Sequence, residues 1–188
     1  MIKSREDLRF YLSEDKKVMG GGNFPRMVIT WLLGAEHSRM MLYIWVLRHL
    51  EFYTNVKVPF IGYILKLFFE VWHRRQEYKY GVYIHTNLCG YGLRIVHIGG
   101  IHLNALSVGN YCTVTQGVVL GSKNSNENRP IIGNNVELTI GSKVIGKVVI
   151  GDNVVVCPNS VVINDIPSNC IASGVPVSIV KEKRMKVL

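Results

Sequence analysis

Three histidines, His85, His97 and His102, lie close together near the middle of the 188-residue chain. Histidine is the side chain best suited to take up a proton at neutral pH, because its unperturbed pKa is near 6.5. It is also a common zinc ligand, and His97 and His102 are five residues apart, a spacing suggestive of two ligands on one metal. A structural role beside the core is the third alternative, so the residue types alone leave the chemistry open.

The segment that follows these histidines has an apolar residue at every sixth position. Counting from Val108, nine of ten such positions are aliphatic, and the tenth, Asn126, falls in a polar insert. This period fits neither an α-helix nor an alternating strand, but it fits a parallel β-helix of triangular section, in which each hexad makes one side and one corner. We expect coils about 4.8 Å apart, with glycines and with Asn110, Asn134 and Asn153 at the corners.

Upstream the period is less regular. Ile84 and Val96 keep the frame, whereas His102 does not, and a one-residue slip near residues 103–105 accounts for the difference. Residues 84–163 then make four to five coils of about 18 residues, three hexads each.

The first part of the chain has helical spacing instead. A capping box at Ser4 predicts a helix over about 5–18. A second helix is expected over about 25–53, with an interruption near Gly34, and a third from Pro59. The third helix is expected to carry Ile61, Ile64, Leu65, Phe68, Phe69 and Trp72 on one face.

We therefore divide the chain into a helical region, residues 1–80, and a mainly β domain, residues 81–188, that ends in a C-terminal extension. The polar residues 122–130 interrupt the repeat and predict a loop that projects from one corner. A loop on a rigid scaffold is a frequent place for function, and a merely tolerated insertion is the alternative.

Charge and composition exclude several classes of protein. The net charge of +9 is spread over both parts, with 13 Lys/Arg against 8 Asp/Glu in residues 1–80 and 9 against 5 in residues 81–188. Nucleic-acid binding favours a concentrated basic patch, so we expect no nucleic-acid partner. An anionic small ligand or an anionic membrane surface fits this charge.

The sequence also bears on localisation. We find no secretory signal and no apolar run long enough to span a membrane. The four cysteines form no CxxC pair, which favours a reduced, cytoplasmic protein.

Three segments, 92–101, 116–133 and 165–177, resemble in sequence and order the hexapeptide-repeat acyltransferase superfamily. The resemblance covers about residues 81–181 and is nearest to the serine acetyltransferases and the related enzymes that acetylate cell-surface polysaccharides. It implies a left-handed β-helix that moves an acetyl group from acetyl-CoA, as co-substrate, to a hydroxyl acceptor. It also implies a homotrimer whose active sites lie between neighbouring β-helices.

The resemblance implies roles for individual residues. His97 matches the catalytic histidine, the general base that takes the proton of the acceptor hydroxyl, and His85 matches a structural histidine. Tyr83 replaces the aspartate that serine acetyltransferases pair with that base, and Arg129 replaces a second histidine at the end of the loop. We assign Tyr83, Arg129 and His102 to the acceptor site; for His102 a core or corner position is the alternative. These replacements favour a sugar hydroxyl of polysaccharide synthesis as the acceptor, and L-serine is the other candidate.

The same resemblance places acetyl-CoA in a groove between two β-helices, along small-residue coils. Gly141, Ser142 and Ser160 match the small residues of that groove. The basic residues Lys181, Lys183 and Arg184 would meet the phosphates of the coenzyme, and a solvated basic tail is the alternative.

A peripheral contact with the inner face of the membrane is a further expectation. It rests on aromatic and basic residues of the helical region, and packing of these aromatics into a core is the alternative. The residues concerned are Trp31, Trp45, Trp72, Arg48, Lys66, Arg74 and Arg75.

Two other functions use the same fold. A non-catalytic β-helix scaffold would account for the replacements at Tyr83 and Arg129. A γ-carbonic-anhydrase-like enzyme would bind zinc through three histidines, but His85 is too near His97 in the sequence to supply a ligand from a further coil. We therefore expect no metal.

Overall fold

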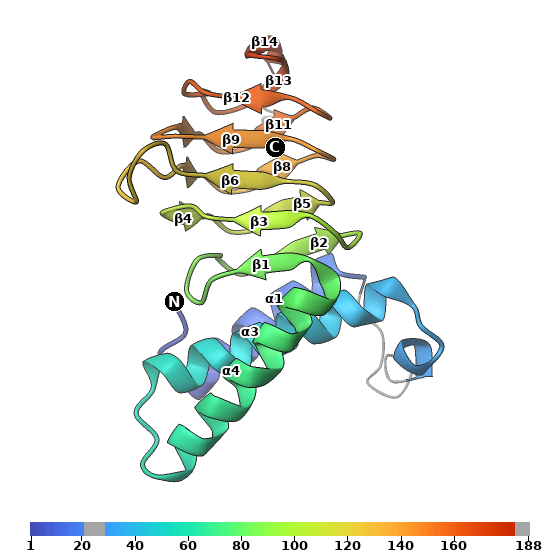
Figure 1. The fold of residues 1–188 in the computed structure, drawn as a ribbon, viewed down its shortest axis with the longest axis vertical. Coiled ribbons are helices and arrows are strands. Elements are labelled where there is room, and N and C mark those ends of the chain that lie inside the picture. Colours follow the sequence, from blue (N-terminus) through green and yellow to red (C-terminus); the bar gives the residue numbers. More distant parts are fainter. Residues whose placement is uncertain (21–28, 183–188) are drawn as a thin grey trace, which may run out of the picture.

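The computed structural model describes residues 1–20 and 29–182. Three long helices, α1 (Arg5–Val18), α3 (Glu36–Asn55) and α4 (Ile61–Tyr80), lie below a tall stack of strands (Figure 1). The capping box is confirmed, because the Ser4 Oγ accepts the Asp7 N–H at 3.0 Å and α1 ends at the predicted residue.

The second and third predicted helices differ from expectation in part. The expected start of the second, near Pro25, lies outside the described residues. Gly34, with φ +83°, ends a helical turn over residues 29–32, so α3 begins afresh at Glu36. α4 begins at Ile61, and its predicted apolar face is not the buried one: Phe69 is buried, but Ile64 is 58% exposed.

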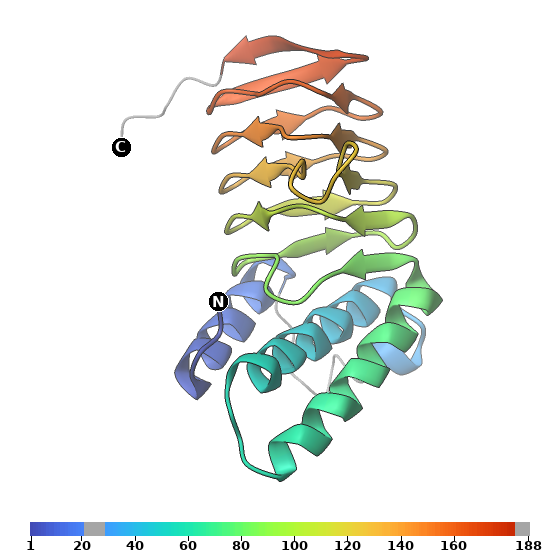
Figure 2. The same ribbon diagram turned by 60° about the vertical axis from the view of Figure 1, so that its left-hand side comes forward.

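The strands form three sheets that wind into a triangular column (Figures 1 and 2). Sheet A contains β1, β3, β6, β9 and β12, sheet B contains β4, β7 and β10, and sheet C contains β2, β5, β8, β11, β13 and β14. All strand pairs are parallel except β13 with β14. The strands are β1 (Val82–Ile84), β2 (Arg94–Val96), β3 (Ile101–Leu103), β4 (Ser107–Val108), β5 (Thr113–Thr115), β6 (Val119–Gly121), β7 (Ile131–Ile132), β8 (Glu137–Leu138), β9 (Lys143–Ile145), β10 (Val149–Ile150), β11 (Val155–Val156), β12 (Val161–Val162), β13 (Cys170–Gly174) and β14 (Val177–Glu182).

The hexad residues form the core of this column, as predicted. Val114, Leu138 and Val156 are in register in sheet C, and each is fully buried. Upstream, Ile95 rather than Val96 points inward, eight residues before the inward Leu103. The predicted slip near 103–105 is confirmed, because the hexad residue of the next sheet, Val108, follows Leu103 by five positions and not six.

Left-handed backbone turns the corners. Gly117 has φ +72°, and a Cβ there would lie 3.3 Å from the Cα of Gly141 in the next coil, so glycine suits this corner. The three predicted asparagines all lie in turns at the corners, but only one of them is left-handed. Asn153 has positive φ, but Asn110 and Asn134 do not; instead, the Oδ1 of each accepts a backbone N–H of the adjacent coil.

A buried arginine joins the helices to the first coil. Arg48 of α3 is fully buried and ion-pairs with Asp15 of α1 at 2.8 Å and Glu51 at 2.9 Å. Its guanidinium also donates to the carbonyls of Cys89 and Gly90. Arg48 therefore cannot contribute to a membrane surface, which corrects the expectation for that residue. The network fixes α1 and α3 against the column.

The three tryptophans predicted at the membrane surface differ in exposure. Trp45 and Trp72 are half-buried and pack together, with ring centroids 6.2 Å apart, so the alternative of core packing holds for them. Trp31 is 41% exposed. Within residues 1–20 and 29–182, no helix combines the length and apolar character that crossing a bilayer requires.

Candidate active site

His97 lies at the corner between the first and second coils, directly after β2. Its backbone has φ +67°, and its side chain is 61% exposed. A left-handed conformation costs a non-glycine residue about 1–3 kcal/mol and is concentrated at functional sites. The eight-residue interval between Ile95 and Leu103 makes this corner longer than a hexad corner, so the imidazole is held clear of the column.

The ring of His97 contacts a carboxylate from the helical region. Glu36, the first residue of α3, places Oε2 3.3 Å from the His97 Nδ1, and its Oε1 accepts the Ile98 N–H at 2.5 Å. That backbone hydrogen bond is the main reason why the pKa of the Glu36 carboxyl is lowered, so the group is ionised at neutral pH. Sequence reasoning did not identify Glu36, because no local pattern connects it with a residue 61 positions away.

A pocket of about 370 Å³ adjoins this pair. The end of α1, the first turn of α3 and strand β2 line it, and Arg94 supplies a guanidinium. Its volume is within the range of small-molecule sites. An exposed imidazole, a carboxylate and a cation thus meet at one concave surface.

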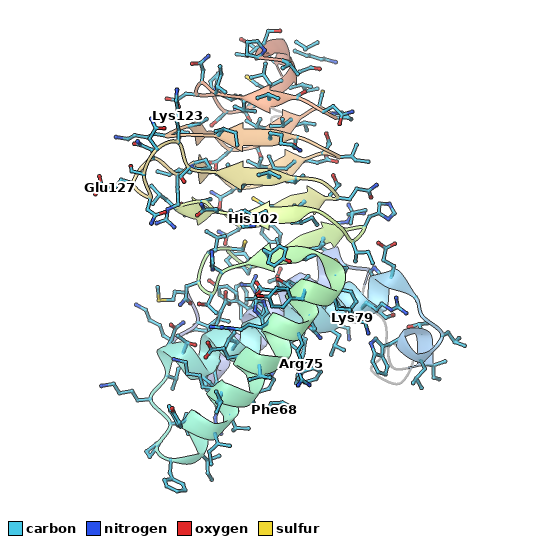
Figure 3. All side chains as sticks on the ribbon, in the orientation of Figure 1. Phe68, Arg75, Lys79, His102, Lys123 and Glu127 are labelled. Atoms are coloured by element: carbon cyan, nitrogen blue, oxygen red, sulfur yellow. The ribbon has the colours of Figure 1, made fainter. Side chains whose placement is uncertain are left out.

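Tyr83 and His102 form a separate pair on the outer face of sheet A. They are register partners on β1 and β3, and their ring centroids are 5.8 Å apart. Tyr78 of α4 packs edge-on against Tyr83 at 6.2 Å. Figure 3 shows His102 on this outer face. Tyr83 therefore contacts His102, whereas the ring of His97 contacts Glu36.

Arg129 ends the projecting loop between β6 and β7. Its Nε donates to the Asn126 carbonyl at 2.7 Å, which closes the loop on itself. Lys123 and Glu127 point outward from the same loop (Figure 3). The guanidinium of Arg129 is thus oriented within the loop by one of its own donors.

The coenzyme residues predicted on the upper coils are not equally accessible. The side chains of Ser142 and Ser160 are fully buried, and the Ser160 Oγ accepts the Gly174 N–H. Among the described residues the Ser142 Oγ has no hydrogen-bond partner. The predicted acetyl-CoA contacts use the backbone of these small-residue coils, so the burial of the serine side chains leaves that prediction untested. Gly141 lies at a left-handed corner.

Two basic positions complete this description. Lys181 is exposed on β14, whereas Lys183 and Arg184 lie outside the described residues. Lys143, which sequence reasoning did not single out, donates its Nζ to the carbonyls of Gly117 at 3.0 Å and Gly141 at 3.2 Å. Within the described ranges, no group of three His, Cys, Asp or Glu side chains is arranged to hold a metal ion.

No model of a known protein family matches the chain. Over 111 residues the chain is 38% identical to a serine acetyltransferase of Synechococcus elongatus. The matched residues make up 57% of this chain and 46% of that protein. A serine acetyltransferase of Staphylococcus xylosus is 36% identical over 111 residues, with 57% and 51% coverage. The chain spans about half the length of the curated relatives it matches.

Solved structures show the same fold. A serine acetyltransferase of Brucella abortus superposes with a TM-score of 0.72 at 20% identity, over 95% of this chain and 71% of that one. A serine acetyltransferase in complex with CoA gives a TM-score of 0.61 at 25% identity, over 76% and 57% of the chains. The predicted left-handed parallel β-helix with an N-terminal helical region is confirmed. The chain has homologues among the serine acetyltransferases, which are members of the hexapeptide-repeat superfamily.

Proposed function

We propose, from this homology to serine acetyltransferases, that the chain transfers an acetyl group from acetyl-CoA to a hydroxyl acceptor. The observation that carries the proposal is the exposed imidazole of His97 at a strained corner beside a pocket. Homologous sequences and the CoA complex of a structural relative support it.

The reaction follows from the chemistry of an alcohol and a thioester. His97 takes the proton of the acceptor hydroxyl as its oxygen forms a bond to the acetyl carbonyl carbon. The tetrahedral intermediate then collapses, the carbon–sulfur bond breaks, and the imidazolium returns the proton to the leaving thiolate. A general base of this kind contributes about 10²–10⁴-fold in rate.

The acceptor is proposed to be a sugar hydroxyl of a polysaccharide precursor. At Tyr83 and Arg129 the chain lacks the carboxylate and the imidazole of the serine enzymes, and the Tyr83–His102 ring pair offers an aromatic surface instead. L-serine is the second candidate, because the matched relatives are named for it. We assign Tyr83, His102 and Arg129 to the acceptor site.

The acetyl-CoA site is proposed to run along the upper coils. Gly141 and the main chains of Ser142 and Ser160 would contact the pantetheine arm, and Lys181 would meet the phosphates. The exposed position of Lys181 supports this assignment. A homotrimer is proposed with it, supported by the in-register pair Ile131 and Val149 on the outer face of sheet B, which are 39% and 45% exposed. Sedimentation equilibrium measures the oligomer, and a monomer at micromolar concentration contradicts the trimer.

We also propose that α4 rests on an anionic membrane that carries the acceptor. Its outward face exposes apolar side chains, among them Ile64, Leu67 and Phe68. Arg75 and Lys79 are exposed farther along the same helix (Figure 3). Apolar and cationic groups together suit an anionic lipid surface. A second copy of this protein would present the same cationic face, and the two faces would repel each other.

Co-sedimentation with vesicles tests this surface. We expect binding to phosphatidylglycerol vesicles and its loss in Ile64→Glu, whose side chain is 58% exposed. Ile163→Glu on the column, 51% exposed, is the matched control and should still bind. Equal binding by both variants, or none by the unaltered protein, contradicts the membrane contact.

Thiol release from acetyl-CoA tests the proposed function itself, across a panel of L-serine and several sugars. We expect release that depends on acceptor and falls at least ~10²-fold in His97→Ala, with coenzyme binding retained. Near-normal turnover by that variant rejects His97 as the base. Coenzyme binding without any acetyl transfer supports the scaffold instead.

A further inference from the structure

The catalytic carboxylate that the resemblance leads one to expect beside His97 is missing from its usual place. Tyr83 occupies that position, and its ring packs on His102. An imidazole without a fixed partner at one nitrogen can rotate and can carry its proton on either nitrogen. The corner of His97 therefore needs another group to orient the ring if His97 is the base.

Glu36 has the geometry of such a group. Its Oε2 is 3.3 Å from the His97 Nδ1, while the Ile98 N–H holds Oε1. The carboxylate is thus fixed to the backbone directly after the histidine that it contacts. It also sits at the N-terminus of α3, where the helix dipole favours a negative charge. The Arg48 network anchors α3 itself to the first coil.

The contact determines which nitrogen acts as base. A carboxylate only accepts hydrogen bonds, so Nδ1 keeps the proton and donates a hydrogen bond to Glu36. The lone pair is then on Nε2, the atom left to take the acceptor proton. The other ionisable groups at this pocket are His37 and the nearby Arg39 of α3, and Arg94 of β2. Among the described residues that line the pocket, Glu36 is the only one that carries a carboxylate.

We propose that Glu36 is a positioning residue for His97: it replaces, from α3, the carboxylate lost at Tyr83, holds the imidazole in its Nδ1–H form and stabilises the imidazolium. This inference rests on the proposed function and assigns to the helical region a part in catalysis. The helices then do more than cover the first coil, because one of them completes the base.

Glu36→Gln is the sharpest test. The glutamine keeps an oxygen for the Ile98 N–H, but its amide offers a donor to Nδ1 and so favours the Nε2–H form, which cannot act as base through Nε2. We expect kcat to fall about 10- to 100-fold with little change in KM. The loss is smaller than the ~10⁴-fold seen when a buried triad aspartate is altered, because His97 and Glu36 are 61% and 40% exposed.

Glu70→Gln is the matched control. Glu70 is 37% exposed on α4 and pairs with Arg74, so this variant removes a charge and an ion pair of similar exposure away from the site. We expect unchanged kcat. In the double variant Glu36→Gln/His97→Ala, the loss should not exceed that of His97→Ala alone, since Glu36 acts through His97.

A spectroscopic measurement separates positioning from a structural role and needs no substrate. Two-bond ¹H–¹⁵N NMR of the imidazole should show the Nδ1–H form in the unaltered protein and the Nε2–H form in Glu36→Gln. The Nε2–H form in the unaltered protein overturns the proposal, as does a loss of rate in Glu36→Gln without a change of tautomer. If His97→Ala stays active, His97 is not the base, and if no acetyl transfer is found at all, the proposed function fails; the tautomer in either case shows whether Glu36 orients the ring.

Discussion

Replacement of Arg48 by methionine is expected to destabilise the fold severely. The substitution keeps an apolar stem of similar length but removes a fully buried guanidinium. It leaves the carboxylates of Asp15 and Glu51, 3% and 1% exposed, without their cation, and the carbonyls of Cys89 and Gly90 without a donor. Breaking a buried ion pair by removing one partner costs about 3–5 kcal/mol, a large part of a total stability of about 5–15 kcal/mol.

Thermal unfolding followed by circular dichroism measures this loss. At about 2–4 °C per kcal/mol for a chain of this size, we expect Tm to fall by about 10 °C. Arg9→Met on the exposed side of α1 is the control and should change Tm by less than about 2 °C. The triple variant Arg48→Met/Asp15→Asn/Glu51→Gln should recover part of the loss, because it removes the two stranded charges. An Arg48→Met protein as stable as the control refutes the reasoning.

Two further predictions concern the core. Burial lowers the pKa of His73 to about 4, below the unfolded value near 6.5, so the unfolded chain binds more protons between these values and stability falls as pH falls through this window. His73→Phe should therefore lose less stability between pH 6.5 and 4, by up to about 3 kcal/mol, and equal acid sensitivity in urea titrations of both proteins contradicts this. Leu120→Ala should lower the free energy of unfolding by about 2–5 kcal/mol, because the side chain is fully buried. A loss below about 1 kcal/mol in urea titrations would show that the coil collapses around the gap.

The column was predictable because its signal repeats. One aliphatic residue per hexad must face inward in every coil, so a single error does not change the frame. The small residues four positions along each hexad form a second inward row, in which the side chains of Ser142 and Ser160 are fully buried. Their match to coenzyme-binding residues concerns the backbone of these coils, and it stays a prediction.

The contacts between the helices and the column were not predictable in the same way. Arg48 follows an apolar run and was interpreted as a surface cation, because its partner Asp15 is on another helix, 33 residues away. Glu36 is likewise far from His97 in the sequence and adjacent only in space. Such pairs depend on how a helix docks against the first coil, and neither hexad period nor helical spacing carries that information.

The antiparallel return of β14 on β13 has a consequence for solubility. A stack of parallel coils ends in unpaired backbone groups, and an open end of this kind can template the next molecule head to tail. Residues 177–182 cover the last strand of sheet C, with Gly174 at the turn, and the helices cover the opposite end of the column. Removal of this hairpin should therefore open one end of the column only, so two molecules could pair end to end, while the helices prevent growth into longer filaments.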